Sequence, residues 1–137
     1  MDAVVLGESG RTLTFSDPQA RDASPSDFLT VAVVGPDLRA SRQVYAGWEN
    51  GFSTLAAFFA DLADHWRGWS GQRVFESIEG DLRILATHDG HVNLQVRLWE
   101  TTEPHGWRVE SEIRVDAGEA LSRAANEVAA LITRPQS

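Results

Sequence analysis

The sequence contains no cysteine and no lysine among its 137 residues. Without cysteine the chain cannot form disulfides, a thiolate nucleophile, a cysteine-ligated zinc site or an iron–sulfur cluster. It also has no apolar run approaching the roughly 20 residues that a membrane-spanning helix needs, and its first residues include no basic leader. These absences predict a cytoplasmic protein with no membrane segment and none of the activities that depend on a thiol.

Acidic residues outnumber basic residues in this sequence. There are 20 acidic residues against 12 basic ones, all of them arginine, which gives a formal net charge of -8. Such a surface repels phosphate backbones and anionic membranes, so we expect no nucleic-acid and no membrane partner. An excess of carboxylates attracts a basic protein partner instead.

The length and composition fit one globular domain. Hydrophobic residues make up 42% of the chain and charged residues 23%, as is usual for a folded domain with a single core. We expect one domain over residues 1–137, with N-terminal strands and a mobile loop over residues 1–27 and a core over residues 28–133. Within the first part, residues 11–15 alternate as a strand does and residues 16–27 form a polar loop.

One long amphipathic helix is predicted in the middle of the chain. Its apolar residues are spaced three and four apart, which places them on one helical face, and we expect all of them in the core. They are Phe52, Leu55, Phe59, Leu62 and Trp66. Ser53 is the expected N-cap, and Gly68 is the expected stop signal.

Strands are predicted on both sides of this helix. Residues 28–34 and, more weakly, 38–45 precede it, and the alternating segments 73–79, 82–88, 91–99 and 107–115 follow it. Short turns between them indicate antiparallel hairpins, and a second amphipathic helix ends the chain before Pro135. We therefore expect an α+β fold, an antiparallel β-meander sheet of about six to eight strands with two α-helices packed on one face.

Two histidines flank the turn Asp89-Gly90. In a two-residue hairpin His88 and His91 would be cross-strand neighbours whose imidazoles could share a metal, with Asp89 close by. A metal needs three or four ligands in a fixed geometry, however, and hairpin tips ordinarily carry polar residues for the turn alone. We expect no metal and no cofactor, and His88 and His91 remain the candidates for a metal-dependent enzyme.

Two other groups have the residue types of acid–base chemistry. Asp61 and His65 are one helical turn apart, but both lie opposite the apolar stripe, so we expect an exposed pair with a structural role. Glu76 and Glu79 are an odd number of residues apart along a strand and point to opposite faces. Asp81 is expected as a turn residue, and none of these groups predicts a catalytic site.

The predicted strands 91–99 and 107–115 have one apolar and one polar face. The polar face carries Asn93, Gln95, Arg97, Trp99, Arg108, Glu110, Glu112 and Arg114. An exposed tryptophan beside arginine and glutamate has the composition of an interface hot spot. The candidate partner-binding residues are Arg97, Trp99, Glu110 and Glu112, with Trp99 as anchor and the glutamates as charges. Alternatively, Trp99 packs at the sheet edge against the loop over residues 103–106.

Three short motifs carry a resemblance to known proteins. Residues 66–71 (WRGWSG), 79–82 (EGDL) and 88–92 (HDGHV) resemble a group of small bacterial proteins classed as a domain family of unknown function. With residues 77–80 (SIEG), the arrangement is more distantly similar to the WapI-like immunity proteins. The likeness spans about residues 28–132, and it implies a protein that occludes a toxin partner and catalyses no reaction.

The expected function is therefore that of a non-enzymatic protein-binding protein, of the immunity type, that occludes a basic toxin. One alternative is a small-molecule binding module with an aromatic pocket between helices and sheet. Another is the metal-dependent enzyme at His88 and His91. A homodimer through the polar sheet face is also compatible with the sequence.

Overall fold

The computed structural model describes residues 3–8, 10–19, 28–46, 52–100 and 104–133. In chain order the elements are β1 (Ala3–Glu8), β2 (Arg11–Gln19), β3 (Phe28–Gly35), β4 (Leu38–Tyr45), α1 (Ser53–Asp64), β5 (Arg73–Glu76), β6 (Leu82–His88), β7 (Val92–Trp99), β8 (Arg108–Val115) and α2 (Glu119–Thr133). The α+β class is confirmed. The expected loop over residues 16–27 is shortened, because β2 continues to Gln19, and residues 20–27 lie outside the described part.

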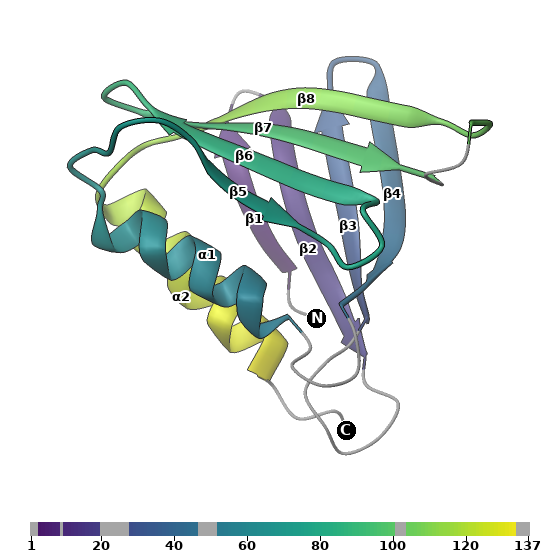
Figure 1. Cartoon of the computed structure of the whole chain (residues 1–137), viewed down its shortest axis with the longest axis horizontal. Coiled ribbons are helices and arrows are strands. Elements are labelled where there is room, and N and C mark those ends of the chain that lie inside the picture. The colour runs from purple at the N-terminus through teal and green to yellow at the C-terminus, as the bar shows by residue number, and fades with distance from the viewer. Residues whose placement is uncertain (1–2, 9, 20–27, 47–51, 101–103, 134–137) are drawn as a thin grey trace.

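The strands form two antiparallel sheets of four strands each, β1-β2-β3-β4 and β5-β6-β7-β8. The expectation of one continuous meander is therefore wrong. The reason lies between β4 and β5, where the chain forms α1 and does not turn back to pair with β4. Each sheet has one apolar face, and the two sheets bury these faces against each other, with β8 across β1, β2 and β3 (Figure 1).

The two helices lie side by side and cover the open side between the sheets (Figure 1). Helix α1 contacts both sheets through neighbouring aromatic rings. The ring of Phe59 lies 6.0 Å from that of Phe15 in β2, and the ring of Phe58 lies 6.1 Å from that of Phe75 in β5. Helix α2 packs against β1 and β2, so residues of both sheets and both helices share one core.

The N-terminal strands belong to this core. Val4 and Leu6 of β1 are buried, as are Leu13 and Phe15 of β2. Gly7 allows β1 to approach β8 closely, since a Cβ atom at this position would lie 2.7 Å from Cγ2 of Ile113 and 2.3 Å from the carbonyl oxygen of Arg11.

The long helix differs from its prediction at both ends. Phe52 occupies the N-cap position with no side-chain hydrogen bond, so Ser53 is the first helical residue and not the cap. The helix ends at Asp64, and Trp66 follows in a turn with 43% of its surface exposed. The other four residues of the apolar stripe are buried as expected. Neither described helix is long and apolar enough to cross a membrane.

Candidate functional site

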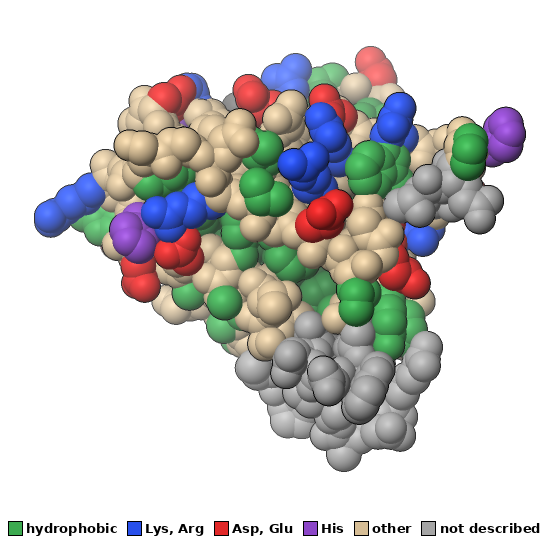
Figure 2. Space-filling view, in the orientation of Figure 1, with side chains coloured by type: hydrophobic (Ala, Val, Ile, Leu, Met, Phe, Trp, Pro, Cys, Tyr) green, Lys and Arg blue, Asp and Glu red, His purple; other side chains and the backbone are tan. Residues whose placement is uncertain are grey.

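The outer face of the β5–β8 sheet is the side turned away from the core. Alternation produces it, because most of the inward-facing residues of these strands are buried and the residues between them point outward. The face consists of Val74, Glu76, Arg83, Leu85, Thr87, Asn93, Gln95, Arg97, Trp99, Arg108, Glu110, Glu112 and Arg114. Figure 2 shows arginine side chains gathered over this sheet with acidic side chains among them.

The strand register places the four candidate residues of the sequence on this one face. Arg97 lies directly opposite Glu110, and its Nε donates to a carboxylate oxygen of that residue. Gln95 lies opposite Glu112, at the next outward-facing position along the same pair of strands. Trp99 is the last residue of β7 and lies opposite a further arginine on β8.

The sign of the charge on this face differs from that of the whole chain. Four arginines and three glutamates leave the face with one positive charge, whereas the chain carries -8. Among the described residues, only Arg97 of these arginines forms an ion pair. Arg83 of β6 lies directly opposite Arg97, a like-charged pair that costs stability in a sheet. Arg83 is not among the residues predicted for this face, although its alternation with the buried Leu82 and Ile84 places it on the polar side.

Trp99 is half-buried beneath the guanidinium group of Arg108, whose Cζ lies 5.9 Å from the ring centroid. Its indole Nε1 is buried and has no hydrogen-bond partner among the described residues. Beside the ring is a cavity of about 400 Å³ lined by Arg97, Trp99, Arg108 and Glu110. Residue 103, at the start of the loop proposed to cover Trp99, lies outside the described part.

The hairpin that carries His88 and His91, called the histidine hairpin below, has a different register from the one expected. Val92 is the partner of His88, so the turn contains three residues and His91 is not a cross-strand neighbour of His88. The N–H of Gly90 donates to Nδ1 of His88 at 3.1 Å, which leaves the proton on Nε2, 2.8 Å from the carbonyl oxygen of Trp66. Both nitrogens of His88 are thus used within the chain.

The rest of this hairpin is also held by local hydrogen bonds. The backbone N–H of His91 donates to Asp89 Oδ1 at 3.2 Å, and this bond lowers the pKa of the Asp89 carboxyl below its ordinary value, with a smaller contribution from Asn93. No group of three His, Cys, Asp or Glu side chains in the described ranges is arranged to hold a metal ion. Among the described residues, the polar side chains of this hairpin thus bond within the turn itself.

The other acidic groups have structural partners. Asp61 and His65 are about half exposed, as expected, and Asp61 also accepts from Arg73 at the start of β5. Asp81 lies in the turn before β6, but it is buried, with an exposure of 1%. Its carboxylate accepts from Nε of Arg42 in β4 at 2.6 Å and from Oγ of Ser77 at 2.7 Å. The sequence did not reveal this pair, because its members are 39 residues apart on different sheets.

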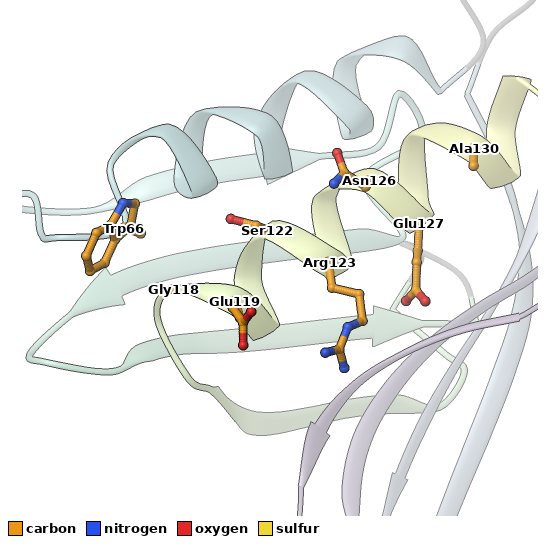
Figure 3. Close-up of a pocket in the computed structure, with 8 residues that line it drawn as sticks. All are labelled: Trp66, Gly118, Glu119, Ser122, Arg123, Asn126, Glu127 and Ala130. Atoms are coloured by element: carbon orange, nitrogen blue, oxygen red, sulfur yellow. The ribbon is translucent and has the colours of Figure 1, made fainter.

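A second cavity, of about 780 Å³, lies on the outer side of α2 beside Trp66. Figure 3 shows Trp66 at one end and the other lining residues on α2 and the turn before it. They are Gly118, Glu119, Ser122, Arg123, Asn126, Glu127 and Ala130. The groove is open and lies on the outer side of α2, whereas the expected small-molecule binding module would have an aromatic pocket between helices and sheet.

A family model described as a family of unknown function (DUF6228) matches residues 4–135 of the chain. No curated protein and no solved structure matches it.

Proposed function

The chain belongs to the DUF6228 family, a family of unknown function, and we propose that it is a non-enzymatic protein-binding protein. Its binding site is the outer face of the β5–β8 sheet. The observation that carries this proposal is the arrangement of Trp99 under Arg108, beside a cavity, where Arg108 forms no ion pair with another described residue.

The composition of this face is that of a protein interface. Tryptophan and arginine are the side chains most enriched at binding hot spots, since each offers a large contact area together with hydrogen-bond donors. Arg83, Arg108 and Arg114 make no ion pair with another described residue, so their charges are available to a partner. The face contains no histidine, and Glu110 is engaged by Arg97, which favours binding over acid–base chemistry.

Inhibition of a basic toxin, as in the WapI-like immunity proteins, is the second candidate. The net charge of -8 favours it, because an acidic protein attracts a basic one over long range. On the outer face itself Glu112 is the glutamate of β8 without an ion pair among the described residues, and Glu110 would have to release Arg97. If the partner is a basic toxin, Glu110→Arg together with Glu112→Arg strongly weakens the complex with the toxin, whereas Arg108→Ala strengthens it.

Site-specific photo-cross-linking in the native cell tests the binding surface. Gln95 on the outer face of the β5–β8 sheet is replaced by a photoreactive amino acid, and Gln43 on the outer face of the other sheet is the matched control. We expect a discrete adduct with another protein from position 95 and none from position 43. Equal adducts from both positions, or none from position 95, would contradict the proposal.

A further inference from the structure

We propose that the outer face of the β5–β8 sheet receives an acidic segment of its protein partner, whose carboxylates bind between Arg83 and Arg97 and at Arg108. This inference rests on the proposed function and adds the chemical class of the partner.

The first observation is the charge pattern across the middle of the sheet. Glu76, Arg83, Arg97 and Glu110 occupy adjacent positions on the four strands, so the two arginines are neighbours at the centre. Like charges directly opposite each other repel. Glu110 forms an ion pair with Arg97, and Arg83 forms none with another described residue. A carboxylate between the two guanidinium groups would accept hydrogen bonds from both and remove this repulsion.

The second observation is the cavity at the end of the same strands. Arg108 and Arg97 line it together with Trp99, and the guanidinium group of Arg108 has only the aromatic ring as its partner among the described residues. A guanidinium group stacked on an aromatic ring keeps its edge free to bind a carboxylate through two parallel hydrogen bonds. The cavity therefore fits a short acidic side chain.

The mixture of charges distinguishes a protein from a nucleic acid. Three glutamates lie among the four arginines of the face, and a phosphate backbone would meet them at close range. The remainder of the chain is strongly acidic and repels any polyanion as it approaches. A protein segment with a few carboxylates and uncharged residues between them satisfies the arginines without this conflict.

A second copy of the chain fits less well. A symmetric dimer would place this face against the same face of the other copy, so that two surfaces, each with one positive charge, would meet. The acidic occupant must therefore come from a different surface.

Titration with a short blocked acidic peptide, in which glycine and serine separate two glutamates, tests the inference with the intact chain and is followed by NMR. The reporters are the indole N–H signal of Trp99 and the side-chain amide of Gln95, and the indole signal of Trp66 beside α2 serves as the internal control. We expect saturable shifts at Trp99 and Gln95 and none at Trp66. Arg108→Ala should raise the dissociation constant at least about tenfold, the loss expected for one charge-assisted pair of hydrogen bonds. Arg39→Ala, which removes an equal charge from β4, should change it less than about twofold.

Three further titrations identify other occupants. A hexalysine peptide that shifts Trp99 more strongly than the acidic peptide would indicate a basic partner, and a thymidine hexanucleotide that does so would indicate a nucleic acid. Shifts that grow with the concentration of the protein alone would indicate a second copy. Any of these results, an absence of binding by the acidic peptide, or equal effects of Arg108→Ala and Arg39→Ala would overturn the inference.

Failure of this inference can be told apart from failure of the proposed function. If position 95 still cross-links to another protein while the acidic peptide does not bind, the binding surface is correct and the acidic partner class is wrong. If neither occurs, the proposed function itself is wrong.

Discussion

Arg42 and Asp81 form the ion pair that joins the two sheets, with Nε of the arginine 2.6 Å from Oδ2 of the carboxylate. Asp81 is buried, and Ser77 donates to its second oxygen. Arg42 also donates to the carbonyl oxygen of Glu100, just after the end of β7. A single arginine of β4 is thus connected to two segments of the β5–β8 sheet, close to the end of the strand that carries Trp99.

Replacing Asp81 should destabilise the fold much more than breaking an exposed pair. Asp81→Asn removes the charge that Arg42 faces, and we expect a loss of about 2 to 3 kcal/mol, because Arg42 remains partly exposed and keeps some hydration. Glu110→Gln breaks the exposed pair with Arg97 and should cost less than about 1 kcal/mol. Urea unfolding measures both values, and similar losses in the two variants would contradict the structural role of Asp81.

Gly7 should tolerate alanine poorly because of space as well as backbone conformation. Its φ of +110° is unfavourable for alanine, and the added Cβ would overlap Ile113 and the backbone of Arg11. We expect Gly7→Ala to cost at least about 3 kcal/mol. Gly10 is the matched control, with φ at +80° and open space around it, and Gly10→Ala should cost about 1 kcal/mol. Thermal unfolding compares the two, and equal costs would show that β1 and β8 are not in close contact.

Trp66 should contribute little to stability, although it continues the apolar spacing of α1. Its ring is exposed at 43% and is contacted by the guanidinium group of Arg67. We expect Trp66→Ala to cost less than about 1 kcal/mol, whereas Phe59→Ala, at a fully buried position, should cost about 3 to 5 kcal/mol. If chemical denaturation gives comparable losses, Trp66 belongs to the core after all.

The histidine hairpin should not bind zinc. Both ring nitrogens of His88 are engaged, one by the N–H of Gly90 and the other by the carbonyl oxygen of Trp66. Zinc binding would require at least one of these hydrogen bonds to break and would still lack a third ligand. We expect the melting temperature to stay unchanged on addition of zinc or of a chelator. A zinc-dependent increase that His91→Ala abolishes would revive the metal site.

Local pattern predicted most of the elements, and long-range contacts decided the remainder. Alternation located β6, β7 and β8 and identified the polar side of β7 and β8, since burial of one face imposes a period of two on the residues. The division into two sheets has no such local signature, because alternation does not reveal which strand lies beside β4. The spacing that includes Trp66 likewise continues past Asp64, where the helical hydrogen bonds end.

The candidate site was predictable in its residues but not in its ion pairs. Parity placed Arg97, Trp99, Glu110 and Glu112 on one side of two strands, and the register confirms this. The ion pair between Arg97 and Glu110 depends on which residues face each other, as does the position of Arg83 beside Arg97. Only this register shows which arginines of the face form no ion pair with another described residue.

The central claim is that the outer face of the β5–β8 sheet binds a protein partner through Arg108 and its neighbours. The most direct test measures the yield of the cross-linked adduct from position 95 in the native cell, in three backgrounds: the unchanged chain, Arg108→Ala and Arg39→Ala. We predict that the Arg108→Ala background loses about nine-tenths of the adduct, as a tenfold weaker complex would at partner concentrations well below the dissociation constant, and that the Arg39→Ala background retains it. An adduct of equal yield in all three backgrounds would contradict binding of the partner through Arg108.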